Sequence, residues 1–211
     1  MSFDRFTDQI RSAEELATIV GTPSAFSLKK ELKVLDDNMV RFIAHSPFVL
    51  IGTHSANGWC DVSPRGDGGG FVHVIDNQTI LIPDRPGNKR VDTYRNILET
   101  GRVGLLFLVP GVGERLRVNG RAALIRDAAW LKLLHAQGKQ PLVAVAVSVE
   151  ECFLQCAKAL LRSKLWEPHV RPDLQSLPCA AEMLNDHVQM PEFDTTKIQT
   201  LLDGAYKNNL Y

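Results

Sequence analysis

The spacing of hydrophobic positions changes twice along the chain and divides it into three parts. In residues 1–46 apolar residues recur every three or four positions, as they do on one face of a helix. From residue 47 short apolar runs alternate with a period of two, which is typical of strands. After residue 170 the helical spacing returns. We therefore expect a helical arm over 1–46, a β-rich region over 47–170 and a helical extension over 171–211, all in a single domain.

Both flanking parts are predicted to contain two helices each. In the arm, the first helix ends before Gly21 to Pro23, and the second covers Ser24 to Ala44. In the extension, the helices cover Ala180 to His187 and Thr195 to Leu202, and the last few residues are expected to fray.

The middle part is predicted to be a small antiparallel barrel. About six strands follow one another at short spacing, helices are inserted singly, and no regular strand–helix–strand alternation is present. The expected strand segments are Phe48 to His54, Trp59 to Ser63, Phe71 to Ile75, Thr79 to Pro83, Val103 to Val109, Glu114 to Ile125 and Leu142 to Phe153, with helices at Asn88 to Leu98 and Asp127 to Gln137.

Two polar turns follow strands of this barrel and have the composition of an anion site. The first runs from Ser63 to Asp67 and includes Arg65; the second runs from Ile82 to Arg90. Arg, Lys, Ser, Asn and Gly are the residue types that hold phosphate groups. We expect Asn88 to cap a helix and to place Lys89 and Arg90 in its first turn. Cations are unfavourable there unless an anion lies between them. From the residues alone, a solvated basic turn is an equal alternative.

A second basic block lies at the end of the β-rich region. If residues 156–166 are helical, Lys158, Arg162 and Trp166 share one face, with Ser163 beside them. Such a face suits a flavin edge or a substrate carboxylate. From the residues alone, an amphipathic helix with solvated charges is the favoured interpretation.

Composition and charge exclude several classes of protein. Lys plus Arg equals Asp plus Glu at 24 each, so a nucleic-acid or anionic-membrane partner is not indicated. The apolar runs are too short to span a bilayer and the first residues do not resemble a secretory signal, so we expect a cytoplasmic location. The six histidines lack metal-ligand spacing, and the four cysteines are expected to be free thiols.

The order of these blocks resembles the pyridoxamine 5'-phosphate oxidase-related, FMN-binding split-barrel family, in a bacterial branch of flavin-nucleotide-binding proteins. The similarity extends over about residues 20 to 170. It rests on the two polar turns, on Asn96 to Leu98, on the strand Val103 to Pro110 and on Leu116 to Ala122. It implies a mainly β fold with helices: a six-stranded antiparallel split barrel with peripheral helices, dimeric, with FMN between the subunits.

The resemblance also implies a role for each candidate residue. The FMN phosphate would be held by Lys89 and Arg90 with Asn88, and by Arg65 with Ser63. The backbone at Ile82 and Pro83 would run beside the isoalloxazine, and Arg115 or Arg117 would reach its pyrimidine end. The block of Lys158, Arg162, Ser163 and Trp166 would act on the partner's cofactor. Gln155 stands where this branch usually has His, so a titratable group is missing there.

Two classes of function remain open, and no catalytic residue is identified. The first is an FMN-dependent oxidoreductase that takes two electrons from a nicotinamide or another small reduced substrate. The second is a non-catalytic binder or sensor of flavin, haem or deazaflavin, because fold alone does not fix function. A plain interaction module remains if the basic turns are only solvated. True pyridoxamine-phosphate oxidase activity is disfavoured, because residues 170–211 offer only scattered cations for a second phosphate.

Overall fold

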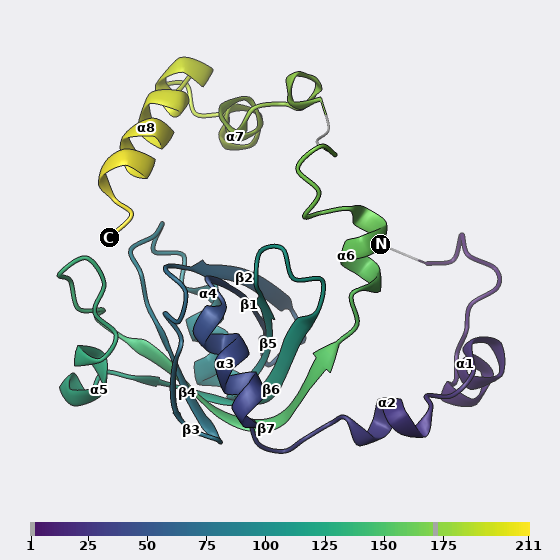
Figure 1. Ribbon diagram of the computed structural model, residues 1–211. Helices are drawn as coiled ribbons and strands as arrows, with labels where there is room; N and C mark the ends of the chain where they lie inside the picture. Colours follow the sequence, from purple (N-terminus) through teal and green to yellow (C-terminus); the bar gives the residue numbers. More distant parts are fainter. Residues whose placement is uncertain (1–2, 171–172) are drawn as a thin grey trace.

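The computed structural model describes residues 3–170 and 173–211, and its centre is one curved antiparallel sheet (Figure 1). The sheet has seven strands in the order β2-β1-β5-β6-β7-β4-β3. The strands are β1 Phe48–His54, β2 Cys60–Gly66, β3 His73–Asp76, β4 Thr79–Pro83, β5 Arg102–Leu108, β6 Arg115–Ile125 and β7 Ala144–Gln155.

The sheet curls like a barrel but does not close. Every neighbouring pair of strands is antiparallel, and the two hairpins β1–β2 and β3–β4 lie at opposite ends of the strand order. Among the described residues β2 and β3 are not paired with each other, which leaves the barrel split. The predicted split barrel is confirmed. The barrel expected to have six strands has seven, and each corresponds to one of the seven segments expected from the sequence pattern.

Helix α4, Asp92–Thr100, lies against the first hairpin and the two strands next to it. It packs against β1, β2, β5 and β6 (Figure 1). The Asn96 amide donates to the Thr53 hydroxyl on β1 at 3.0 Å, and the Thr93 hydroxyl donates to Asp61 on β2 at 2.6 Å. Because buried polar groups must be satisfied, these bonds fix the helix against the first hairpin.

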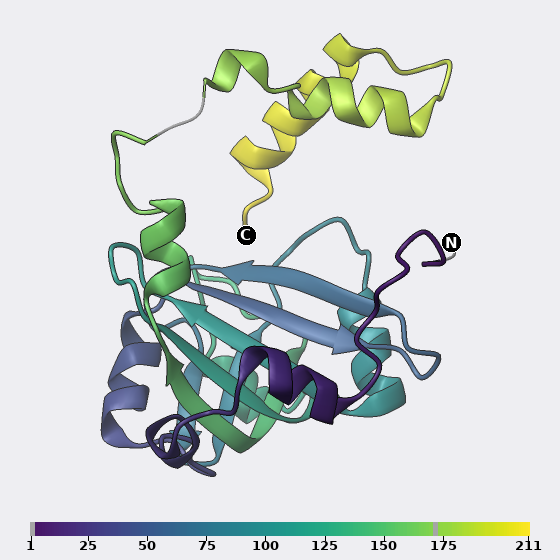
Figure 2. The same ribbon diagram turned by 90° about the vertical axis from the view of Figure 1, so that its right-hand side faces the viewer.

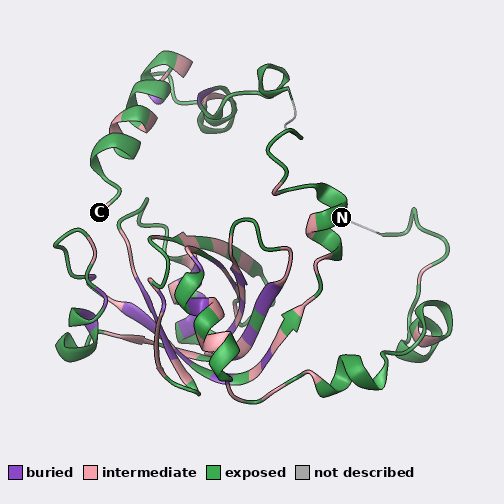
Figure 3. Ribbon diagram, viewed as in Figure 1, coloured by how far each residue is buried: buried purple, intermediate pink, exposed green. Residues whose placement is uncertain are grey.

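The hydrophobic core lies inside the curved sheet. Val49, Ile51, Phe107, Leu116 and Val118 are almost completely buried there, in strands that alternate buried and less buried positions. Figure 3 shows the buried residues concentrated in the sheet and its covering helices.

Strand β4 does not alternate, because both of its faces are covered. Ile80 and Ile82 belong to the main core, whereas Leu81 packs outside it with Leu131 and Leu134. The segment that follows β6 therefore folds back over β4. Helix α5, Ala128–Lys132, is shorter than predicted, and the rest of that segment forms an irregular loop over 133–143.

Two further predicted helices begin or end differently in the structure. The helix expected from Asn88 begins only at Asp92, so the basic turn before it is irregular chain. The helix expected over Ser24 to Ala44 is split into α2, Ala25–Lys29, and α3, Asp37–His45. Between them Leu32 exchanges backbone hydrogen bonds of 2.9 and 2.8 Å with Cys152, on an edge of β7 that β4 leaves open. Leu32 therefore pairs as a strand residue does, although the apolar spacing around it is that of a helix.

The two ends of the chain extend away from the sheet (Figure 2). Helix α1, Ala13–Val20, contains no buried residue. Helices α7, Ala180–Val188, and α8, Thr195–Asn208, confirm the predicted pair and pack against each other through Ala181 and Ile198. They follow α6, Lys158–Ser163, and the short 3-10 helix Leu174–Ser176. None of the described helices is long and apolar enough to cross a membrane.

Replacing Gly120 by Ala tests the close contact between β6 and β7. A Cβ at this position would lie 2.1 Å from the Ser148 carbonyl oxygen, at the point where the β6–β7 register shifts. Because backbone must move to relieve such a clash, we expect Gly120→Ala to lower the free energy of unfolding by about 3 kcal/mol. Urea denaturation measures this change. Gly204→Ala is the control: its Cβ meets nothing within 4 Å in α8, so it should stabilise by about 0.5–1 kcal/mol.

Candidate functional site

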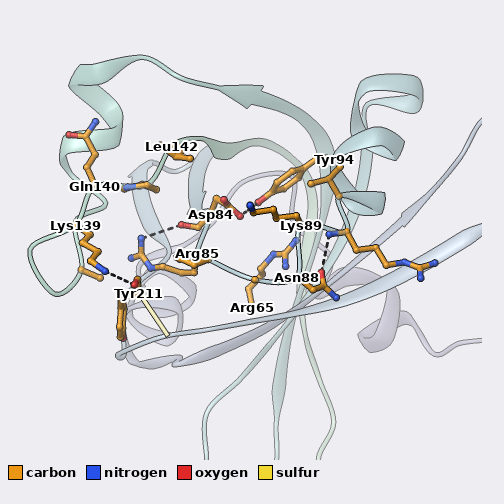
Figure 4. Close-up of a pocket in the computed structure, with 16 residues that line it drawn as sticks. Arg65, Asp84, Arg85, Asn88, Lys89, Tyr94, Lys139, Gln140, Leu142 and Tyr211 are labelled. Carbon is orange, nitrogen blue, oxygen red and sulfur yellow. Dashed lines mark hydrogen bonds between the residues drawn. The ribbon is translucent and has the colours of Figure 1, made fainter. Parts of the chain in front are cut away.

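A cavity of about 360 Å³ opens where β4 ends, and it is the candidate site (Figure 4). Its walls come from segments far apart in sequence: Arg65 from β2, the turn 84–91 after β4, Tyr94 from α4, the loop 136–142 and Tyr211. The turn cannot continue β4 or begin α4, because Pro86 and Gly87 interrupt both kinds of backbone pairing.

The turn after β4 has a specific backbone conformation. Lys89 has a positive φ of 60°, which is uncommon for a residue other than glycine. The Asn88 side-chain oxygen accepts a hydrogen bond of 2.9 Å from the backbone N–H of Arg90, which stabilises the turn locally. Asn88 therefore organises the turn rather than capping α4, whose N-cap is Val91.

Positive charge dominates the lining of this cavity. It contains five cationic side chains, Arg65, Arg85, Lys89, Arg90 and Lys139, and one carboxylate, Asp84. Arg85 and Arg90 each form an ion pair with a carboxylate outside the lining, Asp67 and Asp92 respectively, at 2.6 Å. Among the described residues, Arg65 and Lys89 form no ion pair, and Lys139 donates a hydrogen bond of 2.6 Å to the main-chain oxygen of Tyr211. The cavity therefore has an excess of uncompensated positive charge.

Tyr94 contacts both Asp84 and Arg65 in the lining of the cavity. Its hydroxyl donates to the carboxylate of Asp84, and the Arg65 guanidinium lies 5.6 Å from the centre of its ring. Burial, and next the hydrogen bond to Asp84, raise the pKa of Tyr94 well above its ordinary value. The phenol therefore stays protonated and acts as a donor.

Asp67 connects the two polar turns. Its carboxylate accepts hydrogen bonds from Arg85 at 2.6 Å, from the backbone N–H of Gly68 at 2.7 Å and from the Tyr211 hydroxyl at 2.7 Å. Arg85 also donates to the Leu134 carbonyl at 3.0 Å. Burial acts to raise the pKa of Asp67, but the hydrogen bonds from Tyr211, Arg85 and Gly68 outweigh it and lower that pKa. This buried ion pair fixes the turn after β2 against the turn after β4.

The structure brings four of the predicted site residues together at this cavity. They are Arg65, Asn88, Lys89 and Arg90. Ser63 lies two residues before Arg65 and has the same intermediate burial in the alternating pattern of β2. Ile82 and Pro83 are the last residues of β4 and pair with Val145 and Ala144 of β7. β3 reaches only as far as Leu81, so the other edge of β4 is not covered by a strand there.

Arg115 and Arg117 do not line the cavity. Arg115 is buried and donates hydrogen bonds of 3.0 Å to the Gly113 carbonyl and 2.6 Å to the Cys156 carbonyl. Arg117 lies 5.5 Å from the centre of the Phe153 ring. In this single chain Arg115 supports the ends of β6 and β7, and Arg117 lies on the outer surface of the sheet.

The predicted residues of the second basic block, Lys158, Arg162, Ser163 and Trp166, also lie outside the lining. The Ser163 hydroxyl donates to the Leu160 carbonyl of its own helix at 3.2 Å, and the Trp166 indole donates to the Val112 carbonyl at 2.9 Å. The assignment of this block to the partner's cofactor stays a prediction.

The wall of the cavity opposite Lys89 was not predicted from the sequence. Lys139, Gln140, Leu142 and Tyr211 have no motif around them; Lys139 and Gln140 fall between the expected helix and the expected strand, and Leu142 was expected to begin that strand. Tyr94 was expected on a helix without a role. Among the described residues, no group of three His, Cys, Asp or Glu side chains is arranged to hold a metal ion.

Comparison with known families identifies the fold. The model of the pyridoxamine 5'-phosphate oxidase family matches residues 35–156, which is more than half of the chain. The chain belongs to this family. No curated protein sequence matches it.

Solved structures similar to this chain have low sequence identity. HupZ from Group A Streptococcus is 19% identical with a TM-score of 0.49, over 58% of this chain and 94% of that chain. An FMN-binding protein from Syntrophomonas wolfei is 16% identical with a TM-score of 0.43, over 55% of this chain and 80% of that chain. The family match begins at Leu35 and ends at Cys156, so most of both helical ends of this chain lies outside it.

Asp67 should make the stability of the protein depend on acid pH. Because its pKa is lowered in the folded state, the unfolded chain binds its proton more readily as pH falls. The stabilisation is present above the ordinary carboxyl pKa and is lost as pH falls through the folded-state value. We expect Asp67→Asn to be less stable at neutral pH and to show a shallower loss of stability between about pH 5 and pH 2. Denaturant titrations at several pH values measure both slopes, and equal slopes would contradict the assignment.

The exposed Cys156, beside the buried Arg115, should react faster than the other thiols. A hydrogen bond from the backbone N–H of Lys158, followed by the charges of Lys158 and Arg115, lowers its pKa despite some desolvation. Burial raises the pKa of Cys152 to about 11. Since the thiolate is the nucleophile, iodoacetamide at neutral pH should label Cys156 before the equally exposed Cys60 and leave Cys152 unlabelled. Peptide mass spectrometry over time gives the order, and faster labelling of Cys60 would contradict it.

Proposed function

We propose that this cavity binds FMN, with the phosphate held by Lys89 and Arg65 and by the turn that Asn88 organises. The observation that carries the proposal is the pair of cations, Lys89 and Arg65, that line one cavity without a carboxylate partner among the described residues. Cations gathered at one cavity repel one another, and a phosphate dianion would offset that repulsion with charge-assisted hydrogen bonds. Membership of the pyridoxamine 5'-phosphate oxidase family supports this ligand.

The size and lining of the cavity fit a flavin nucleotide. About 360 Å³ lies within the range of small-molecule sites. The wall beyond the cations is largely apolar or aromatic, with Pro141, Leu142 and Tyr94, and suits a planar ring system. Arg90 also lines the cavity, Ser63 precedes Arg65 by two residues on β2, and the open edge of β4 at Ile82 and Pro83 suits the polar rim of the ring.

We propose an FMN-dependent oxidoreductase as the activity. The cofactor, when bound, supplies two-electron transfer to or from a small-molecule substrate. The residues of this chain bind the phosphate, hold Arg65 and Asp84 in fixed positions through Tyr94, and limit access of water to the cavity. A non-catalytic flavin or deazaflavin carrier would use the same phosphate contacts. Haem fits less well: the described lining contains no His, Cys or Met to serve as axial ligand, and both tyrosines donate to carboxylates.

We propose that the working form is a homodimer in which the second basic block completes the site. Proteins of this family are typically dimeric. Lys158, Arg162, Ser163 and Trp166 lie away from the cavity of their own chain and are available to the cofactor of a second copy. Arg115 would position the start of this block through the Cys156 carbonyl, and Arg117 lies on the outer surface of the sheet.

Titration of the purified protein with FMN tests the phosphate site. We expect Lys89→Ala and Arg65→Ala each to weaken binding by about 10- to 100-fold, because a charge-assisted hydrogen bond contributes about 1.5–3 kcal/mol. Arg95→Ala is the matched control: Arg95 is an exposed cation on α4, near Asp92 but outside the cavity. Quenching of flavin fluorescence gives the affinities. Binding that depends no more on Lys89 and Arg65 than on Arg95 would contradict the site.

The same samples separate an enzyme from a carrier. Rapid reduction of the bound flavin by NADH or NADPH, measured as loss of its visible absorbance, supports the oxidoreductase. Reduction no faster than that of free FMN supports the carrier.

A further inference from the structure

Tyr211 reaches the cavity from outside the family fold. Its hydroxyl donates to Asp67 at 2.7 Å, and its main-chain oxygen accepts a hydrogen bond of 2.6 Å from the Lys139 ammonium. Tyr211 is part of the cavity lining, and Figure 4 shows it beside Lys139 at the end opposite Lys89. Two anchors on different loops therefore hold it at the site.

The segment that carries Tyr211 is otherwise weakly attached. Helix α8 packs mainly on α7, and Leu201, Tyr206 and Leu210 are more than half exposed. Figures 1 and 2 show α7 and α8 standing off the sheet, with the chain after α8 descending to it. Segments with few buried contacts open at low free-energy cost. The anchors at Tyr211 are therefore the main restraint that this end of the chain offers against opening.

We propose that Tyr211 is a latch: the segment after α8 closes the cavity in the ligand-free protein and must release Asp67 and Lys139 for a phosphate-bearing ligand to enter or leave. This inference rests on the proposed function, because the ligand considered is FMN. Release uncovers the Lys139 ammonium, which also lines the cavity. Asp67 keeps its contacts with Arg85 and Gly68 when Tyr211 leaves, so the remaining wall is preserved.

Tyr211→Phe opens the latch with the least change to the structure. It removes the hydrogen bond to Asp67 and keeps the ring and the main-chain oxygen. Loss of one hydrogen bond to a charged group should raise the open population about tenfold. Both the association and the dissociation rate of FMN should rise by about that factor, with a small change in affinity. Tyr206→Phe is the matched control, because Tyr206 lies on the exposed surface of α8 and outside the lining.

The experiment combines stopped-flow fluorescence with hydrogen exchange of the full chain. FMN is the probe for the rates, and exchange of residues 205–211 without FMN reports opening independently. Support requires faster FMN binding and release and faster exchange in Tyr211→Phe, with Tyr206→Phe like the native protein.

Each of the other possible outcomes supports or overturns a proposal. Normal FMN binding with unchanged rates in Tyr211→Phe overturns the latch and leaves the proposed function standing. Faster dissociation alone makes Tyr211 a fixed contact of the ligand and also overturns the latch. FMN binding by Tyr211→Phe but not by the native protein supports both proposals. Absence of binding in all three proteins overturns both.

Discussion

The site depends on one topological constraint: the chain must cross from β4, near one end of the sheet, to β5, which pairs with β1 near the other. The crossing leads into α4, which packs on β1, β2, β5 and β6. The stretch between the end of β4 and the start of α4 belongs to no strand or helix. It lies as irregular chain along the cavity, where its cations remain available to a ligand. The position of the basic turn therefore depends on the fold as well as on the residues of the turn.

The Asp67–Arg85 pair converts this arrangement into a defined pocket. Both side chains are largely buried, with 9% and 16% exposed, so their charges are poorly screened by solvent. A buried pair adds little net stability, but loss of one partner leaves an uncompensated charge. The Asp67–Arg85 pair matters for the geometry of the site, because it joins the turn that follows Arg65 to the turn that contains Lys89. Arg85 is thus a structural cation, whereas Arg65 and Lys89 are the ones left for a ligand.

The sequence allowed the sheet to be predicted because its strands are short and separated by strong turn signals. The chain alternates with a period of two from residue 47, and β4 has the bounds that were expected, Thr79 to Pro83. The helices were less predictable. The helical spacing of apolar residues continues from Ser24 to Ala44, but Leu32 pairs with Cys152 at the open edge of β7. No local sequence pattern predicts this long-range pairing. Asn88 was expected to cap a helix, yet its side chain satisfies the turn instead.

The residues that line the cavity were predicted only where they belong to a local motif. Arg65, Asn88, Lys89 and Arg90 belong to two short motifs and meet at one cavity. Lys139 and Tyr211 belong to no motif and arrive by long-range folding, 72 residues apart from each other. The family pattern could not reveal Tyr211, because the match ends at Cys156.

The two ends of the cavity differ in how their cations are held. At one end the backbone of Lys89 has a left-handed conformation and the Arg65 guanidinium lies against the Tyr94 ring, so Arg65 is positioned before a ligand arrives. A preorganised charge of this kind binds an anion with little further loss of side-chain entropy. At the other end Lys139 is held by a main-chain oxygen of a loosely packed segment. Opening of that segment gives a phosphate-bearing ligand access to the rest of the cavity.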